Sequence, residues 1–347
     1  MSPMRRPVVR SRRVPLSIKH LFLCFLALVF AVGVHAVPSS AEAQEEPPAS
    51  LRIGVLEFGT VRWTLDVVQH HGLAAERGLD LEIVPLGSTN AVTVALQGDA
   101  VDIIVSDWIW VSRQRAEGRD YVFRPYSVAV GGVVVNPEAG ISELEDLRGK
   151  RFGVAGGPVD KSWLLLRAYA RKQLGEDMAQ VVEPTYAAPP LLNSLMLRGR
   201  LPAVLNYWHY SARLEAAGMQ PMLSVDEILK GLGISEQVPV LGWVFDEQWG
   251  RANRQTLDGF FEAVDEAMAR LAESDDEWER IRPLTKAEND AVLAALREGY
   301  RAGVPGEWGP PQVEAARSVF EILVEEGGRD LAGRGEGLSA GTFWGVE

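Results

Sequence analysis

Residues 96–107 read LQGDAVDIIVSD, and this stretch decides the fold class. A helical pattern ends near Leu96, Gly98 follows it, the apolar run 101–105 comes next, and Asp107 is placed to begin another helix. Glycine is common just after a helix because it tolerates backbone conformations that other residues avoid, and Asp accepts hydrogen bonds from the free N–H groups of a helix start. A short buried strand between two helices is typical of a parallel α/β sheet.

The same alternation runs through most of the chain. Strands are expected at 51–56 and 79–86 before this stretch, and β-rich residues at 121–123 and 128–135 restart the pattern after it. Further strands are expected at 151–154, 181–182, 203–206, 222–224 and 238–245, with helices at 160–172, 189–197 and 208–217. Beyond residue 247 we expect helices at roughly 247–273, 285–302 and 310–326, then a Gly-rich loop. The sequence therefore predicts two doubly wound α/β lobes and a helical C-terminal tail.

The first 43 residues have the order of a secretory signal peptide. A basic leader precedes the uncharged apolar run 21–36, and Ala41-Glu42-Ala43 has the small-x-small form of a cleavage site. A membrane anchor is the alternative, but the run is shorter than the ~20 residues that a span needs. Arg12-Arg13 also fits the twin-arginine route. We expect a periplasmic protein, exported by the general secretory or the twin-arginine route, with a linker at 44–50.

Composition and charge narrow the function classes. The chain has 347 residues, 24% charged and 47% hydrophobic, with a formal net charge of −12, which is ordinary for a globular protein of about two domains. The acidic balance argues against nucleic-acid binding. The one Cys, Cys24, lies in the expected signal peptide, so the mature chain would hold no disulfide, thiolate zinc site or Cys nucleophile. No nucleotide-binding or hydrolase motif is present. We therefore expect no catalytic residue, no metal and no cofactor.

Five segments carry a resemblance to a known family. They are RIGV at 52–55, LQGDAVDI at 96–103, ISELEDLRGKRFGV at 141–154, LRGRLPAV at 197–204 and FFEAV at 260–264. In this order the chain resembles, over about residues 50–325, the exported solute-binding proteins of ABC importers in the nitrate, sulfonate, taurine and thiamine-precursor group. Pro202 departs from the family, which usually has Asp there.

The resemblance implies a fold in which the chain crosses twice between its lobes. Lobe I would comprise residues 51–130 plus 240–330, and its helical C-terminal part would pack on it. Lobe II would comprise residues 134–236. A C-terminal tail at 331–347 would end the chain's second pass through lobe I. Two hinge strands would lie near 128–133 and 239–243. The implied function is capture of a small solute between the lobes by a monomer and its delivery to a membrane permease with a separate ATPase. The alternatives are a sensing subunit for a membrane signalling protein and an exported enzyme related to pyrimidine synthases, which depend on a Cys-rich motif that this chain lacks.

Residues just after the strands are expected to face the ligand in such a fold. The candidates are Glu57, Thr60, Arg62, Trp63, Ser88, Thr89, Asn90, Ser106, Asp107, Trp108, Asp160, Trp163, Asn206, Tyr207, Trp208 and Trp243.

The residue types at these positions suggest a ligand class. Six Trp residues (63, 108, 110, 163, 208 and 243) fall in or beside the expected loops, and we expect at least two of them to line the ligand, where an indole ring stacks on a flat ring or a cation. Residues 88–90 fit either an anion site at a helix start or an ordinary helix cap. Three acids, Glu57, Asp107 and Asp160, against Arg62 and Lys161 favour an amine or nitrogen heterocycle over a sulfonate-like anion.

Overall fold

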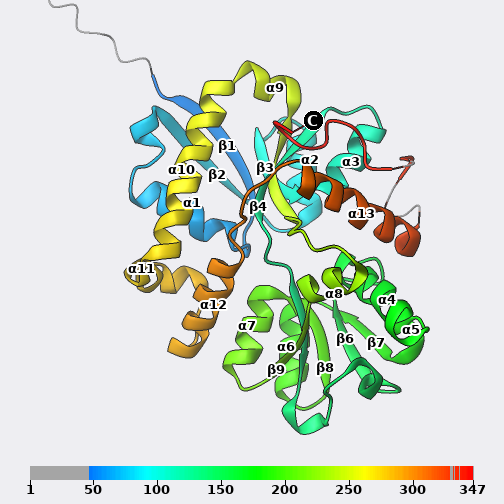
Figure 1. Cartoon of the computed structure of the whole chain (residues 1–347). Coiled ribbons are helices and arrows are strands. Elements are labelled where there is room, and N and C mark those ends of the chain that lie inside the picture. The colour runs from blue at the N-terminus through cyan, green and yellow to red at the C-terminus, as the bar shows by residue number, and fades with distance from the viewer. Residues whose placement is uncertain (1–46, 329–330, 332, 336, 347) are drawn as a thin grey trace, which may run out of the picture. The chain divides into compact units, whose positions relative to one another are not determined.

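Two five-stranded sheets organise the chain (Figure 1). The computed structural model describes residues 47–328, 331, 333–335 and 337–346, so the expected signal peptide and residues 44–46 of the expected linker lie outside the described residues. The last two residues of that linker, 49–50, begin strand β1. Sheet A has the order β2-β1-β3-β10-β4 and sheet B the order β7-β6-β8-β5-β9. The strands of sheet A are β1 (Ala49–Leu56), β2 (Leu79–Leu86), β3 (Ile103–Asp107), β4 (Tyr121–Ser127) and β10 (Leu241–Asp246). Those of sheet B are β5 (Gly131–Val135), β6 (Arg151–Ala155), β7 (Glu183–Ala187), β8 (Ala203–Tyr207) and β9 (Gln220–Ser224). The α/β class with two wound sheets is confirmed.

Each sheet contains one strand that runs against its neighbours. β1 pairs in parallel with β2 and β3, whereas β10 is antiparallel to β3 and β4. In sheet B, β6 is parallel to β7 and β8, whereas β5 is antiparallel to β8 and β9. The expectation of parallel sheets is therefore wrong for β5 and β10. Both strands arrive from the other sheet, without a crossover helix of their own sheet to return the chain to the same end.

The helices beside the two sheets lie close to the expected ranges. They are α1 (Val61–His70), α2 (Thr89–Gln97), α3 (Trp108–Ala116), α4 (Lys161–Leu174), α5 (Met178–Val181), α6 (Pro189–Leu197), α7 (Trp208–Ala216) and α8 (Val225–Leu232). The strand expected at 181–182 is wrong: Val181 ends α5, and β7 begins at Glu183. Among the residues described, no helix is long and apolar enough to cross a membrane.

The C-terminal tail contains more helices than expected. They are α9 (Glu247–Ala252), α10 (Arg254–Glu273), α11 (Asp275–Thr285), α12 (Asp290–Ala302) and α13 (Pro310–Gly327). The expected helix at 285–302 does not begin at 285, where α11 ends. Ser274 and Asn289 cap α11 and α12 by accepting hydrogen bonds from Glu277 N and Val292 N. These capping side chains explain the two new helix starts.

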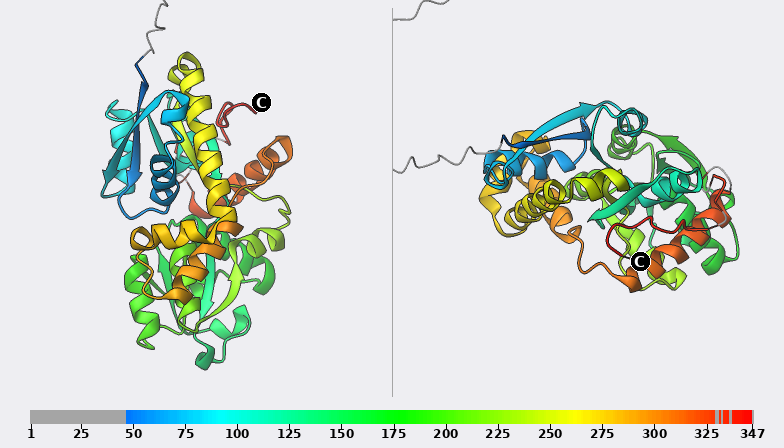
Figure 2. Two further views of the ribbon diagram at one scale, coloured as in Figure 1. Left: turned by 90° about the vertical axis from the view of Figure 1, so that its left-hand side faces the viewer. Right: turned by 90° about the horizontal axis from the view of Figure 1, so that it is seen from above.

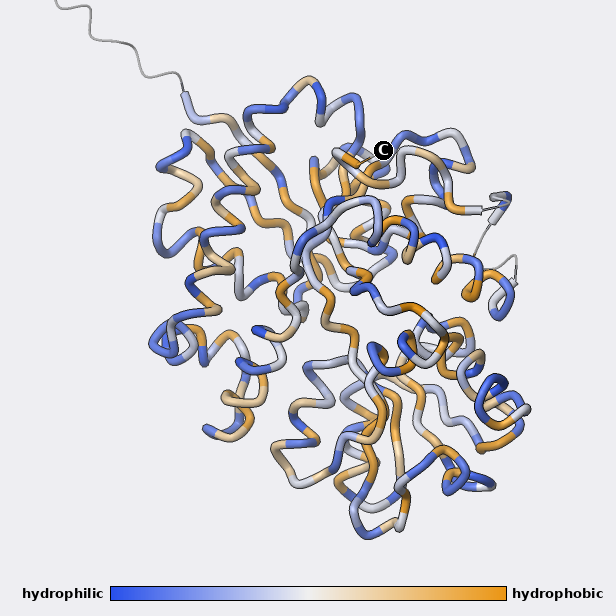
Figure 3. The backbone as a smooth tube through the Cα atoms, viewed as in Figure 1, coloured by the Kyte–Doolittle hydropathy of each residue, from blue (hydrophilic) through white to orange (hydrophobic). Residues whose placement is uncertain are grey.

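The tail contacts elements of both sheets. α10 and α11 pack on α1, beside sheet A, but α12 contacts α7 and α13 contacts α4, both beside sheet B (Figure 2). α9 also contacts β10, and α12 contacts α10 and α11, so the tail packs on lobe I as expected, while α12 and α13 contact helices of lobe II as well. In α13, Phe320 is buried, and its ring centroid lies 6.4 Å from that of Trp108 of α3. Through these contacts one apolar core runs from sheet A to sheet B, and a second core lies under α1 and α10. Figure 3 shows that the strands of both sheets are rich in hydrophobic residues.

Candidate functional site

Five strands, three from sheet A and two from sheet B, lead into helices that carry predicted site residues. β1 precedes α1, β2 precedes α2, β3 precedes α3, β6 precedes α4, and β8 precedes α7. In α3 and α4 the cap is a carboxylate: Asp107 accepts a hydrogen bond from Trp110 N at 2.9 Å, and Asp160 accepts one from Ser162 N at 3.0 Å. The capping interpretation of these two acids is thus correct.

An ion pair connects the strand ends of the two sheets. Lys161 Nζ, at the start of α4, lies 3.0 Å from Asp107 Oδ2, at the end of β3. The Lys161 side chain is 33% exposed and the Asp107 side chain 16%. Asp107 therefore uses one carboxylate oxygen to cap α3 and the other to hold lobe II residue Lys161, so its charge is already neutralised.

A second carboxylate, Asp160, precedes Lys161 and is partly buried. Burial raises the pKa of the Asp160 carboxyl, and Lys161 and the N–H groups of the first turn oppose this shift. Tyr207, at the end of β8, donates its hydroxyl to Asp160 Oδ2 at 3.4 Å. Burial and the nearby Asp160 charge raise the pKa of Tyr207, so its hydroxyl keeps its hydrogen. Gly156 leaves space here, because an added Cβ would lie 2.9 Å from Asp160 Oδ2 and 3.1 Å from the Tyr207 hydroxyl.

Asn206 is buried, and its side chain is hydrogen-bonded within the protein. It is 3% exposed, its Nδ2 donates to Asn193 Oδ1 at 2.8 Å, and its Oδ1 accepts a hydrogen bond from Tyr207 N at 2.9 Å. Ser106, on β3, is 4% exposed. The hydrogen bonds of Asn206 fix the end of β8 and with it the direction of Tyr207.

The predicted residues after β1 and β2 lie closer to solvent. Glu57 is exposed, and Arg62 Nη1 donates to its main-chain oxygen at 3.3 Å. Ser88 caps α2 by accepting a hydrogen bond from Ala91 N at 3.1 Å, and Thr89 and Asn90 are exposed in the first turn. The cap uses the Ser88 side chain and leaves the exposed side chains of Thr89 and Asn90 accessible.

The tryptophans separate into buried and partly exposed groups. Trp63, Trp108, Trp163 and Trp243 are 5%, 0%, 1% and 1% exposed and belong to the apolar cores. Trp110 and Trp208 are partly exposed. The Trp208 ring lies edge-on to Trp63, with 5.9 Å between the ring centroids, which joins the start of α7 to α1.

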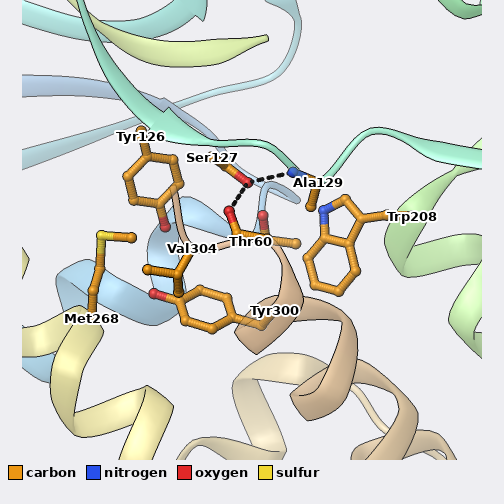
Figure 4. A pocket seen from close by; sticks show the side chains of 9 residues that line it. Thr60, Tyr126, Ser127, Ala129, Trp208, Met268, Tyr300 and Val304 are labelled. Atoms are coloured by element: carbon orange, nitrogen blue, oxygen red, sulfur yellow. Dashed lines mark hydrogen bonds between the residues drawn. The ribbon is translucent and has the colours of Figure 1, made fainter. Parts of the chain in front are cut away.

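A small cavity brings Thr60 and Trp208 together (Figure 4). Its volume is about 10 Å³, which is room for about one water molecule. Its other lining residues are Tyr126, Ser127, Ala129, Met268, Tyr300, Gly303 and Val304. Ser127 donates to Gly303 O at 3.2 Å and accepts from Ala129 N at 3.1 Å, which holds the chain just beyond β4 against the end of α12.

Two buried phenols in this wall were missed by the sequence reasoning. Tyr126 and Tyr300 hydroxyls lie 2.6 Å and 2.8 Å from Thr64 Oγ1. Burial raises the pKa of Tyr126 to about 12 and that of Tyr300 well above its usual value. Three hydroxyl hydrogens serve two mutual hydrogen bonds, so one can donate to another group. The signal was absent from the local sequence, because Tyr300 comes from α12, far along the chain.

Comparison with known proteins places the chain in a family. A family model described as NMT1/THI5 like matches residues 65–277. The chain belongs to the NMT1/THI5-like family. No curated protein sequence matches it.

Solved structures support the fold of this NMT1/THI5-like chain. The alkanesulfonate-binding protein SsuA from Xanthomonas axonopodis pv. citri, bound to MOPS, matches with a TM-score of 0.65 and 17% identity, over 87% of this chain and 100% of that chain. The periplasmic aliphatic sulphonate-binding protein SsuA from Escherichia coli matches with a TM-score of 0.63 and 17% identity, over 80% and 86%. The periplasmic nitrate-binding protein NrtA from Synechocystis PCC 6803 matches with a TM-score of 0.52 and 12% identity, over 73% and 69%. The resemblance to ABC solute-binding proteins is confirmed.

Proposed function

We propose that this protein is the periplasmic substrate-binding component of an ABC importer. It captures a small organic solute between lobe I, built on sheet A, and lobe II, built on sheet B, and delivers it as a monomer to a membrane permease with a separate ATPase. The observation that carries the proposal is the Asp107–Lys161 pair, because it brings the helix starts that follow β3 and β6 to one place. Family membership and the fold support it.

The proposed opening motion would turn at two connections and break named contacts. The chain passes between the sheets at 128–130 and again between α8 and β10, and these connections would be the hinge. Opening would separate Asp107 from Lys161 and Trp108 from Phe320. α13 would move with α4, on which it packs, and the segments on either side of α13 would accommodate the motion.

Exposed apolar side chains support an organic ligand. Phe58, which follows β1, is 66% exposed, and Val159, which follows β6, is 49% exposed. Tyr186 and Leu191, around the end of β7, are 39% and 53% exposed. Large exposed apolar side chains near strand ends are the kind of surface that an organic ligand covers. A bare inorganic anion would not cover them.

The charges favour a cationic or hydrogen-bond-donating ligand. Asp107 is paired with Lys161, so Glu57 and Asp160 remain against Arg62. Asp160 is the more buried acid, and its raised pKa means that its charge is poorly solvated. A positively charged or N–H-bearing group beside Gly156 would stabilise that charge. We therefore propose an amine or a nitrogen heterocycle as the ligand.

Two measurements test this function. Native mass spectrometry of the protein purified from its own periplasm should find a bound small organic molecule. Thermal unfolding with 4-aminopyrimidine should then show a larger stabilisation than with taurine. Leu191→Ala should reduce that stabilisation, whereas Leu197→Ala, an equally exposed leucine at the other end of α6, should not.

The outcomes separate the proposal from its alternatives. A larger shift with taurine would contradict the charge argument, and absence of any bound or stabilising small molecule would contradict solute binding. Co-purification with a signalling protein in place of a permease would indicate the sensing subunit. Chemical conversion of the bound molecule would indicate an enzyme.

A further inference from the structure

α7 of lobe II packs along α12 of lobe I (Figure 1). The two helices share an apolar core, in which Ala212 of α7 is buried together with Leu293 of α12. Trp208, at the start of α7, reaches Gly299 of α12, where an added Cβ would lie 2.9 Å from the indole ring. This interface therefore joins the lobes through helices that the ion pair at the strand ends does not involve.

Arg213 of α7 makes polar contacts across this interface. Its Nη2 donates to Thr285 O at 2.7 Å, and its Nη1 donates to Lys286 O at 3.2 Å and to Glu288 Oε2 at 2.7 Å. All three acceptors belong to residues 285–288, where α11 ends and the chain turns toward α12. The Arg213 side chain is only 18% exposed, so these charge-assisted hydrogen bonds are partly shielded from water.

The acceptors are groups that need a partner from outside their helix. Thr285 is buried and ends α11, and the last carbonyl oxygens of a helix have no N–H partner within it. Lys286 has a φ of +55°, a left-handed conformation that a residue other than glycine keeps only where its surroundings hold it. Arg213 binds its carbonyl oxygen from lobe II, and the Phe58 ring centre lies 5.1 Å from its Nζ on the lobe I side.

Movement of one lobe against the other at this interface would break the contacts of Arg213 together. α7 follows β8 of lobe II directly, whereas α11 is fastened to α1 of lobe I, where Arg280 Nη1 donates to Asp66 Oδ1 at 2.6 Å. Separation would leave the carbonyl oxygen of buried Thr285 without the donor that it has here, which is unfavourable. The contacts of Arg213 therefore favour one arrangement of the lobes over the others.

From these contacts we propose that Arg213 is a positioning residue for solute capture. It holds α7 of lobe II against residues 285–288 of lobe I, and in this way it sets the fraction of the protein in which the lobes have the arrangement described here. The inference rests on the proposed solute-binding function, because the affinity for a solute scales with the fraction of protein in the binding-competent arrangement. It adds to that function a residue that acts through the lobes and not by contact with the solute.

Distance measurement between two spin labels by double electron–electron resonance tests the proposal. The expected mature chain contains no Cys, so Val94→Cys on α2 and Leu197→Cys on α6, both exposed, place one label on each lobe. We expect Arg213→Gln to raise the ratio of separated to joined lobes about 10-fold, because it removes charge-assisted hydrogen bonds. Arg213→Lys should give an intermediate ratio, because it keeps the charge but not the fork of donors.

Two further variants complete the measurement. Arg119→Gln makes the same change at an exposed arginine before β4 and should leave the ratio unchanged. Glu288→Gln keeps Arg213 but removes the charge of one acceptor, and it should raise the ratio about 2-fold, since this carboxylate is exposed. Glu288→Gln also tests the proposal if the Arg213→Gln protein does not fold.

Two results would overturn the inference. The first is an Arg213→Gln protein, or in its absence a Glu288→Gln protein, with the same distances as the parent. The second is a lower unfolding temperature with unchanged distances, which would mean that Arg213 only caps the end of α11. No ligand enters this measurement, so its failure leaves solute binding standing. Absence of any bound molecule in native mass spectrometry would contradict solute binding without changing the distances.

Discussion

The Asp107–Lys161 pair should couple the two lobes measurably. At an effective dielectric constant of about 20, unit charges 3.0 Å apart attract by about 5 kcal/mol. Desolvation and the ordering of the lysine side chain offset most of this attraction, since Lys161 is 33% exposed. We therefore expect a net coupling of about 1 kcal/mol, or about 2 °C in the unfolding temperature of a chain of this size.

A double-mutant cycle with urea unfolding measures this coupling. Asp107→Asn keeps an oxygen to accept the Trp110 N–H and so preserves the α3 cap, whereas Lys161→Met keeps the aliphatic length without the charge. The coupling should shrink at 1 M salt, where the Debye length is ~3 Å. A coupling below ~0.3 kcal/mol at low salt would refute the ion pair as a connection between the lobes.

Three further substitutions test separate parts of the fold. Arg167 lowers the pKa of the Asp177 carboxyl to about 2. The stabilisation that this ion pair contributes is therefore complete above pH ~4 and is lost as the pH falls toward 2. Asp177→Asn should cost about 1 kcal/mol of folding stability at pH 7, after allowance for solvent screening, and should make stability less dependent on pH over that acid range. Gly131→Ala should cost about 3 kcal/mol or more, because φ is +127° and the new Cβ would overlap the Asn206 carbonyl oxygen. Thr64→Val should cost about 2 kcal/mol, since it leaves two buried phenols without their shared hydroxyl.

Urea unfolding checks all three, with pH as the second variable for the first. An Asp177→Asn protein with the same acid sensitivity as the parent would contradict the ion-pair explanation. A stable, soluble Gly131→Ala protein within 1 kcal/mol of the parent would contradict the close approach of β5 and β8. For Thr64, the Thr64→Ser protein should retain most of the stability, and an equal loss in both variants would mean that packing of the methyl group matters more than the hydroxyl.

The local sequence predicted most helices and strands, but it did not predict the direction in which each strand runs in its sheet. The stretch 96–107 predicted the end of α2, the presence of β3 and the cap of α3, although β3 begins at Ile103 and not at Val101, because these features depend on residues within a few positions. The reversed directions of β5 and β10 were not predictable in this way. A strand has the same alternation in either direction, so only its partners in the sheet decide it.

In the candidate site, too, the sequence predicted the positions of residues along the chain but not their contacts. The sequence placed Asp107, Asp160 and Tyr207 just after strands. In the structure Asp107 and Tyr207 are the last residues of β3 and β8, and Asp160 lies between β6 and α4. It did not predict that Lys161 would neutralise Asp107, nor that Tyr126 and Tyr300 would share Thr64. These contacts join residues from distant parts of the chain, and their distances follow from packing.

By itself, the sequence determined the α/β class, the order of most strands and helices, and the resemblance to the family. Capping residues, periodicity and short motifs act over a few residues, so they are legible without coordinates. Only the tertiary structure decided that α12 contacts α7 and α13 contacts α4, that one core spans both sheets, and that Lys161 pairs with Asp107. The reason is that burial and cavity shape depend on which surfaces meet, and this is a property of the whole packed chain.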